Sequence, residues 1–282
     1  MVFQNFLFLC GRATAVAHKS DFRRIDLCRM IKKIIFFAVC FMAIAGLIAS
    51  EYLSGAYTVY TAGKVSSRKL PIYRVGRDDG LISISFDCAW GAEYTDKILD
   101  ALDFYGIKCT FFAVQFWAER YPEYLKKISE KGHEIGTHSA THPKMSELSE
   151  SAIIEELKTS SEAIMAVTGK AVELFRAPFG DYDDLLIETA SGLGLYTIQW
   201  DVDSLDWKDL SAEQIATRVI SRVKSGSIIL CHNNGLHTAE SLPLIFAALI
   251  EKGYVFAPIG SLIYRENYEI NVDGEQVSKS NN

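Results

Sequence analysis

The feature that most constrains this fold is a regular alternation of strand-like and helix-like segments along the C-terminal two thirds of the chain. Residues 81–86 alternate apolar and polar side chains with a period of two, as a strand does. A helix-like segment at 93–105 and an apolar strand-like segment at 107–114 come next. About seven such units follow one another, and this order predicts parallel strands with helices packed outside them.

The later segments continue the alternation. Further strands are predicted at residues 133–137, 173–176, 195–200, 227–231 and 254–257, and further helices at 122–131, 149–168, 182–192, 211–224 and 239–252. Pro122 is tolerated in a first helical turn, and Ser211 with Gln214 forms a capping box. The number of units is too high for a small doubly wound sheet. It predicts an α/β fold of the distorted (β/α)7–8 barrel type.

The N-terminal part of the chain has a different character. Residues 34–50 carry no charge and follow a basic stretch, so residues 34–52 are predicted to be a transmembrane anchor or signal behind a cytoplasmic basic segment, 1–33. A cleaved signal peptide stays open, because an Ala-Ile-Ala sequence inside the segment resembles a cleavage site. A buried core helix is the third interpretation. A start at Met30 rather than Met1 would leave a conventional short basic flank.

The rest of the chain divides into three parts by composition. Residues 53–79 mix small, aromatic and basic residues without a period and are predicted to be a linker. Residues 80–266 form the predicted catalytic domain, which is large enough to fold without disulfides. Residues 267–282 are polar and are expected to be a frayed tail.

Charge and cysteine content exclude some functions. The formal net charge of -6 argues against a nucleic-acid partner, which would need a clustered positive surface. The six cysteines include no CxxC pair. They are therefore expected to be small buried side chains rather than a disulfide framework.

Reactive side chains gather where the predicted strands end. A barrel of this kind carries its chemistry at the C-terminal ends of its strands. The residues found there are Asp87, the pair His138 and His142, Arg176, Asp206 and His232. The sequence therefore predicts one polar site built from five separate strand ends.

His138 and His142 are candidate metal ligands. Four residues apart, they would share one face of a helical turn, and two neutral imidazoles can bind one divalent cation with positions left open for water and substrate. Ordinary surface or core histidines are the alternative, since this spacing often occurs by chance. An acid at a neighbouring strand end, Asp87, favours the metal interpretation.

The other polar residues suggest acid–base chemistry. Arg176 has a planar charged group that can hold the carboxylate of Asp87 and keep it ionised, although a purely structural ion pair is the alternative. His232 could protonate a leaving amine if Asp206 keeps it cationic. A buried histidine bonded to the backbone is the alternative for His232.

These residues, in this order, resemble the polysaccharide deacetylase family, also called NodB-homology or carbohydrate esterase family 4. The resemblance runs from about residue 81 to residue 264 and rests on the blocks SFDCAWG, EIGTHSATHP, LFRAPFGDY, WDVDSLDWK and IILCHNN. The sequences of these blocks are most similar to those of the sporulation-associated deacetylases of spore-forming Firmicutes. That subgroup also has a short N-terminal membrane segment.

The resemblance implies a role for each site residue. Asp87 would be the general base, oriented by Arg176, and His232 would be the general acid, polarised by Asp206. The substrate-binding positions of the family correspond to Pro178, Phe179, Trp207 and Leu230. The expected metal ligands are His138 and His142, with Cys88 at the position where the family has a second Asp.

The implied function is removal of N-acetyl groups from cell-wall polysaccharide outside the cytoplasm, in a sporulation context. A divalent metal is the implied cofactor, and a Cys88 thiolate would favour Zn²⁺. If Cys88 is only a small filler, a weak hydrolase or a glycan-binding pseudoenzyme results. A hydrolase of small cyclic amides and a structural spore-envelope protein also stay open. The sequence does not fix the oligomeric state.

Overall fold

The structure is a computed structural model that describes residue 42 and residues 68–279. The chain divides into two units, Met1–Ser67 and Arg68–Asn282, and the description below concerns the second. The predicted basic segment and the predicted anchor or signal lie outside the described residues. Among the residues that are described, no helix combines the length and apolar character needed to cross a membrane.

Parallel strands form the centre of the second unit. The main sheet has eight strands, in the order β6-β5-β4-β3-β2-β8-β7, with β9 paired to β2. Their bounds are β2 Leu81–Cys88, β3 Thr110–Ala113, β4 Glu134–Thr137, β5 Leu174–Phe175, β6 Tyr196–Thr197, β7 Val202–Asp203, β8 Ile228–His232 and β9 Val255–Phe256. All the pairings are parallel, so the predicted α/β class is confirmed. The path of the sheet ends at β6 and β7, which do not pair, so the predicted barrel is an open half-barrel.

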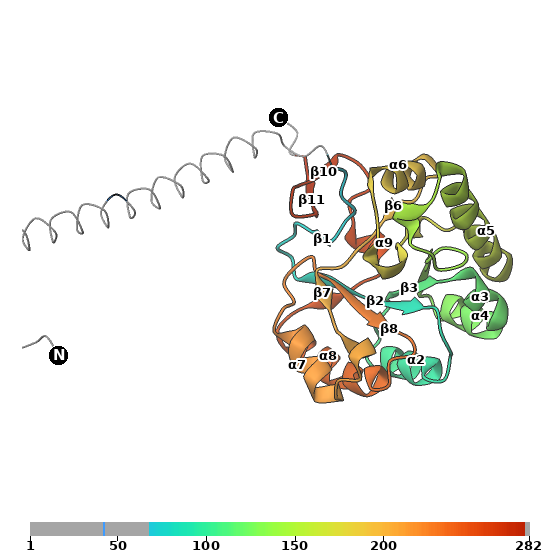
Figure 1. Ribbon diagram of the computed structural model, residues 1–282. Helices are drawn as coiled ribbons and strands as arrows, with labels where there is room; N and C mark the ends of the chain where they lie inside the picture. The colour runs from blue at the N-terminus through green and yellow to red at the C-terminus, as the bar shows by residue number, and fades with distance from the viewer. Residues whose placement is uncertain (1–41, 43–67, 280–282) are drawn as a thin grey trace, which may run out of the picture. The chain divides into compact units, whose positions relative to one another are not determined.

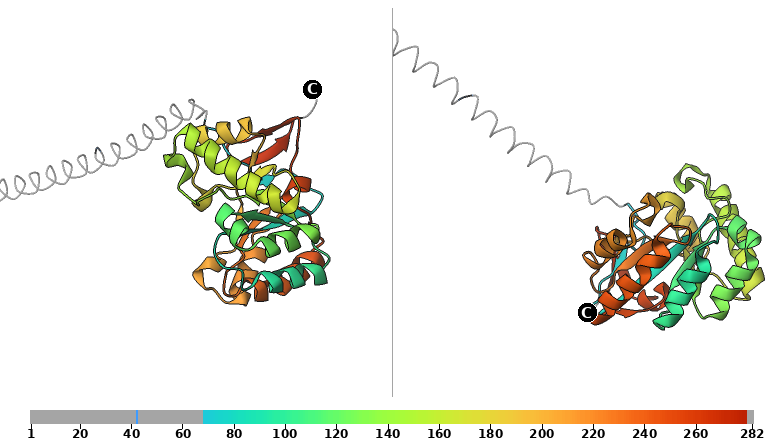
Figure 2. Two further views of the ribbon diagram at one scale, coloured as in Figure 1. Left: turned by 90° about the vertical axis from the view of Figure 1, so that its right-hand side faces the viewer. Right: turned by 90° about the horizontal axis from the view of Figure 1, so that it is seen from below.

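Helices surround the outer face of this curved sheet (Figures 1 and 2). They are α2 Thr95–Phe104, α3 Gln115–Arg120, α4 Pro122–Glu130, α5 Glu150–Thr168, α6 Asp184–Gly192, α7 Ala212–Ile220 and α8 Thr238–Glu251. The short helix α9, Ile259–Leu262, packs instead with Phe112, which lies on the inner side of the sheet. The predicted capping box at Ser211 and Gln214 is present at the start of α7. The short helices α3 and α9 were not predicted.

Strand β2 shows how the sequence pattern determines the two sides of the sheet. Ile84, Phe86 and Cys88 point outward and pack with the helices in the main hydrophobic core. Ser85 and Asp87 alternate with them and point to the inner side, where they are buried as well. Along β2 the period of two therefore separates an apolar outer side from a polar inner side, and the strand places Asp87 on the inner side at its end.

A second, smaller sheet joins the two ends of the described unit. Its strands are β1 Arg74–Val75, β10 Tyr268–Ile270 and β11 Glu275–Ser278, in the order β1-β11-β10. The expectations of an unstructured linker up to residue 79 and a frayed tail from residue 267 are therefore wrong where these strands lie. Strands of two to four largely polar residues leave no sustained period in a sequence, which is why they were missed.

The segment before β1 also pairs with the barrel. The Ile72 amide donates to the Thr197 carbonyl at 2.9 Å, and the Gln199 amide donates to the Ile72 carbonyl at 2.7 Å. The Val75 amide donates to the Gly226 carbonyl at 2.9 Å, next to the start of β8. Residues 72–75 thus connect the β6 side of the sheet to the β8 side.

Candidate active site

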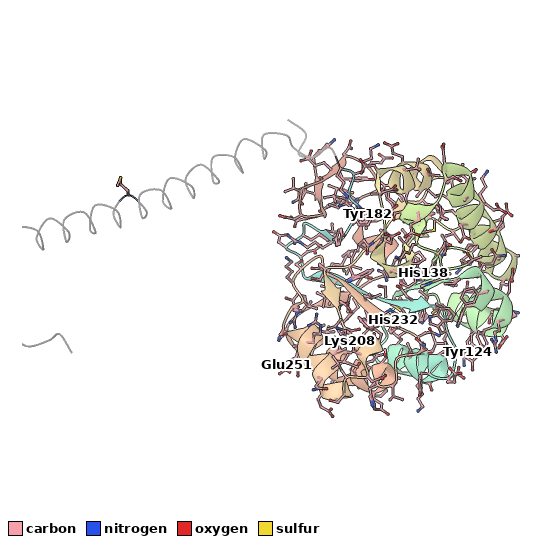
Figure 3. All side chains as sticks on the ribbon, in the orientation of Figure 1. Tyr124, His138, Tyr182, Lys208, His232 and Glu251 are labelled. Carbon is pink, nitrogen blue, oxygen red and sulfur yellow. The ribbon has the colours of Figure 1, made fainter. Side chains whose placement is uncertain are left out.

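The predicted site residues meet at the C-terminal ends of the strands. Asp87 on β2 is in register with His232 on β8, and His138 follows β4 directly. Figure 3 labels His138 and His232, which lie near the centre of the barrel end. Parallel strands place their carboxyl ends at one edge of a sheet, and this brings distant residues together.

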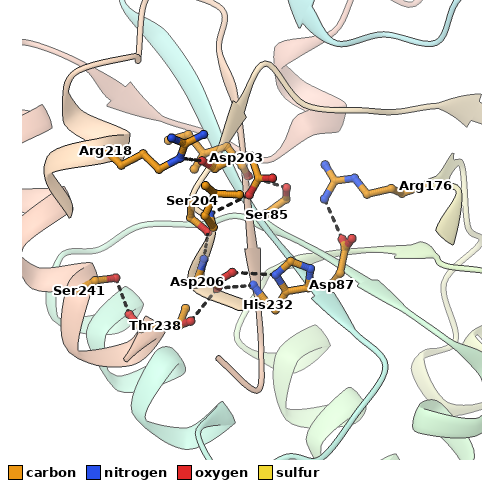
Figure 4. Close-up of polar contacts among 12 residues, drawn as sticks. Ser85, Asp87, Arg176, Asp203, Ser204, Asp206, Arg218, His232, Thr238 and Ser241 are labelled. Carbon is orange, nitrogen blue, oxygen red and sulfur yellow. Dashed lines mark hydrogen bonds and ion pairs between the residues drawn. The ribbon is translucent and has the colours of Figure 1, made fainter. Parts of the chain in front are cut away.

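Arg176 holds Asp87 in a buried ion pair (Figure 4). Its Nη1 donates to Asp87 Oδ1 at 2.8 Å, its Nη2 donates to the Gln199 carbonyl at 3.2 Å, and its guanidinium lies 4.2 Å from the Phe112 ring centroid. Burial alone would raise the pKa of Asp87, but Arg176, His138 and His232 together lower that pKa below its ordinary value. Asp87 is therefore an ionised carboxylate that can accept a proton.

His138 and His142 are neutral imidazoles with different surroundings. The His138 Nδ1 bonds to the Arg176 carbonyl at 2.8 Å, which makes Nδ1 the donor and leaves an Nε2 lone pair 3.5 Å from Asp87 Oδ2. Burial lowers the pKa of His138 to about 4 and also lowers the pKa of His142. The two ring centroids are 5.0 Å apart. The structure thus brings both candidate ligands together in a form that can bind a cation.

Glu156 on α5 holds the loop between the two histidines. Its Oε2 accepts the amides of Ala140 and Thr141, each at 2.8 Å, and its Oε1 accepts the Thr141 hydroxyl at 2.6 Å. The loop needs such support, because Ser139 and His142 have positive φ angles of 71° and 60°. The sequence analysis missed Glu156, since one Glu in a Glu-rich helix carries no distinguishing signal.

His232 and Asp206 form the second charged pair of the site (Figure 4). The His232 Nδ1 donates to Asp206 Oδ1 at 2.8 Å, and the His232 amide and the Thr238 hydroxyl donate to Asp206 Oδ2 at 2.7 and 2.6 Å. Burial lowers the pKa of His232, but the bond to Asp206 and the charge of that carboxylate outweigh burial and raise the pKa above its ordinary value. His232 therefore keeps a proton to donate. Thr238 was not predicted.

Cys88 does not join the site. It is fully buried on the outer side of β2, and its thiol lies 3.9 Å from the Phe86 carbonyl. Burial, together with the nearby charge of Asp87, raises the pKa of Cys88 well above its ordinary value, so the group is a thiol and not a thiolate. The geometry therefore does not support the suggestion that Cys88 replaces a metal-binding Asp. Cys231 also belongs to the outer core, and its burial agrees with the expectation for the cysteines.

The donor set fits the family's metal site only in part. Within residue 42 and residues 68–279, no group of three or more His, Cys, Asp and Glu side chains is arranged to hold a metal ion. Two imidazoles are present, but the nearest carboxylate, Asp87, is already bonded to Arg176. The expected three-ligand site is thus incomplete in the described part of the chain.

The predicted substrate-binding residues fall into two groups. Pro178 and Leu230 are buried, and Leu230 precedes His232 by two residues on β8, on the same side of the strand. Phe179 and Trp207 are exposed, with 69% and 55% of their surfaces accessible. Phe179 has a φ of 60°, and its ring lies 4.6 Å from the His142 ring. Exposed aromatic rings at the edge of a polar site are suited to binding a ligand with an apolar face.

The fold and the site define a class: parallel α/β barrels with an acid–base centre at the strand ends. The chain belongs to the polysaccharide deacetylase family. The family model for polysaccharide deacetylase matches residues 74–198, which include Asp87, His138, His142 and Arg176. This is a family of hydrolases.

Relatives and solved structures agree with this assignment. The chain is 34% identical to the protein YlxY of Bacillus subtilis, over 68% of this chain and 60% of that protein. It is 31% identical to a peptidoglycan-N-acetylglucosamine deacetylase of Bacillus cereus, over 64% of this chain and 67% of that protein. Among solved structures, it is similar to wild-type BA3943 of Bacillus anthracis, described as a CE4 family pseudoenzyme, with 33% identity, 68% coverage of each chain and a TM-score of 0.66. A BA3943 mutant described as having restored enzymatic activity is 34% identical, covering 68% of this chain and 70% of that chain with the same TM-score.

Proposed function

We propose that this chain hydrolyses the N-acetyl amide of an N-acetylated cell-wall glycan, releasing acetate and a free sugar amine. The observation that carries the proposal is that two charged dyads, Asp87–Arg176 and His232–Asp206, lie side by side. Asp87 and His232 are in register on the neighbouring strands β2 and β8. Buried ion pairs are often no more stabilising than apolar side chains of similar size. Two such pairs at one barrel end therefore favour a role in chemistry over a role in stability.

The two dyads supply opposite steps of amide hydrolysis. Asp87 is ionised and accepts a proton from the attacking water, whose oxygen adds to the acetamide carbonyl carbon. His232, whose pKa is raised by Asp206, donates its proton to the nitrogen as the carbon–nitrogen bond breaks. Each such proton transfer contributes about 10²- to 10⁴-fold to a rate.

The incomplete metal site limits this chemistry. No step is assigned to a metal, because no three candidate ligands in the described residues are arranged to hold one ion, and Arg176 already binds one oxygen of Asp87. The expected preference for Zn²⁺ depended on a Cys88 thiolate, and the buried thiol does not support it. Hydrolysis is therefore proposed to be slow.

The test is acetate release from N-acetylglucosamine oligomers and from peptidoglycan. Wild type is compared with Asp87→Asn and His232→Gln, and the matched control is Asp103→Asn on the outer surface of α2. Asp87→Asn is expected to lower the rate about 100-fold or more, while Asp103→Asn leaves it unchanged. Acetate release that is the same in wild type and Asp87→Asn would exclude the proposed base. Each series is run with chelator and with added Zn²⁺.

Glycan binding without turnover is the second candidate function. Two observations favour it: Cys88 faces the core, and the chain is similar to a structure described as a pseudoenzyme. Wild-type protein that binds N-acetylated oligosaccharide but releases no acetate with any metal would establish this alternative and reject the first.

We further propose that the domain acts outside the cytoplasm, tethered to the cell membrane by residues 34–52, and that it serves sporulation. The uncharged segment behind a basic flank supports the tether. The names of relatives that act on peptidoglycan support the external location. The resemblance of the sequence blocks to those of sporulation-associated deacetylases supports the sporulation context. An alkaline phosphatase fused after residue 67 is expected to be active, and an inactive fusion would contradict the external location.

A further inference from the structure

Trp90 is a large aromatic residue that the proposed chemistry does not use. It lies two residues beyond the end of β2, and 57% of its surface is exposed. Its indole packs against Phe116 at 5.4 Å between ring centroids and meets the His142 ring at 5.8 Å in an edge-on arrangement. An exposed indole beside a site histidine offers an apolar surface that a bound ligand can cover.

The backbone next to Trp90 is held by buried side chains. The Gly91 carbonyl accepts the Trp117 indole N–H at 2.6 Å and the Asn233 amide N–H at 2.9 Å. The Asn233 backbone amide in turn donates to the Asp87 carbonyl at 3.1 Å. Gly91 has a φ of 57°, which favours glycine there. The segment that carries the indole is thus tied to the strand ends that carry the charged dyads.

A groove adjoins Phe116, the aromatic neighbour of Trp90. It has a volume of about 500 Å³ and is also lined by Thr141 and Glu119. Phe179, whose ring centroid lies 4.6 Å from that of His142, presents a second exposed ring. His142 is therefore flanked by two accessible aromatic side chains, with a partly polar groove leading away from one of them.

We propose that Trp90 forms a sugar-stacking subsite, which binds a pyranose ring of an N-acetylated glycan chain next to the unit that is hydrolysed. A pyranose has an apolar face of C–H groups that suits an aromatic plane and hydroxyls that suit the polar groove. This inference rests on the proposed function and deepens it.

The test measures binding separately from hydrolysis. The dissociation constant for an N-acetylglucosamine pentamer is determined by calorimetry for wild type, Trp90→Ala and Trp90→Phe. The matched control is Phe104→Ala, which removes an 83% exposed ring at the end of α2. Trp90→Ala is expected to weaken binding roughly five- to tenfold, Trp90→Phe about twofold, and Phe104→Ala not at all.

The outcomes separate this inference from the proposed function. Equal pentamer affinity in wild type and Trp90→Ala would overturn the subsite, even if acetate release by wild type supports hydrolysis. Weaker binding by Trp90→Ala, with no acetate released by wild type, would support the subsite and reject the hydrolysis. Absence of any pentamer binding by wild type overturns the subsite. If Trp90→Ala fails to fold, the folded variant Trp90→Phe decides. A lower affinity of Trp90→Phe for the pentamer supports stacking on a full indole. Unchanged affinities of Trp90→Phe for the pentamer and for the N-acetylglucosamine monomer contradict it.

Discussion

Removing the carboxylate of Glu156 should disturb the site without touching a charged dyad. Glu156 lies on α5, and it accepts three hydrogen bonds from the loop that places His142. Two variants separate the bonds from the charge. Glu156→Ala removes all three acceptors, whereas Glu156→Gln keeps an oxygen for the two amides and an amide group to which the Thr141 hydroxyl can turn.

The expected magnitude follows from the burial of the groups left behind. A hydrogen bond contributes about 0.5–1.5 kcal/mol net, and a buried donor left unpaired costs about 1–3 kcal/mol. Ala140 is only 8% exposed, so its amide would lose its partner without reaching water, whereas Thr141 is exposed and can bond to water. Glu156→Ala should therefore lower the free energy of unfolding by about 2–3 kcal/mol, and Glu156→Gln by less than about 1 kcal/mol.

Urea unfolding gives the stability, and the imidazole NMR signals of His142 give the loop geometry. A control variant, Glu155→Ala, changes the neighbouring exposed residue on the same helix. We expect shifted His142 signals in Glu156→Ala and near-native signals in Glu156→Gln. This account of the loop would be refuted if Glu156→Gln lowered the free energy of unfolding as much as Glu156→Ala does. It would also be refuted if Glu156→Ala lowered that free energy by less than about 0.5 kcal/mol.

Three further predictions concern the buried charges and histidines. Arg176→Met should destabilise the domain by about 3–5 kcal/mol at pH 7, because Asp87 stays buried without its partner, and urea unfolding near pH 4 should show a smaller difference. Asp206→Asn should return the pKa of His232 toward its ordinary value, because the hydrogen bond and the charge that raise that pKa are gone. An NMR titration in which His232 of the variant stays protonated to as high a pH as in wild type would contradict this. Burial lowers the pKa of His133 to about 4, so the folded state binds fewer protons than the unfolded state below pH 6.5. About 2–3 kcal/mol of the free energy of unfolding should therefore be lost as the pH falls from 6.5 to about 4. Unfolding measurements on His133→Asn should not show this loss.

The sequence predicted the barrel because its signals there are redundant. Strand β2 alternates along its whole length, α4 begins with proline, and α7 has a complete capping box. The position of the site followed from topology, since parallel strands carry their ends to one edge and each end could be located in the sequence. Asp87, Arg176, Asp206 and His232 were therefore assigned to one place before their distances were known.

The supporting contacts could not be predicted in the same way. Glu156 and Thr238 act from helices, and a bond from a helix to a loop depends on how the helix is rotated and packed against the sheet. Strands β10 and β11 pair with each other as a local hairpin, whose Asp273-Gly274 turn is the one local signal for it, but the pairing of β11 with β1 joins segments about 200 residues apart and leaves no local pattern. Local sequence patterns thus located the strand ends, while tertiary packing determined which side chains hold them in place.

Cys88 shows how the alternation of a strand decides which residues can reach the site. Because Asp87 points inward, a residue that continues β2 must point outward, and Cys88 does so while pairing with Ala113 of β3. A carboxylate at position 88 would be buried against apolar side chains there, at a cost of several kcal/mol, unless the strand ended one residue earlier. A cysteine is small and apolar enough to be buried on the outer side of β2 without that cost. The same side chain that fits the outer core therefore leaves the end of β2 with a single carboxylate, Asp87, on the side of the site.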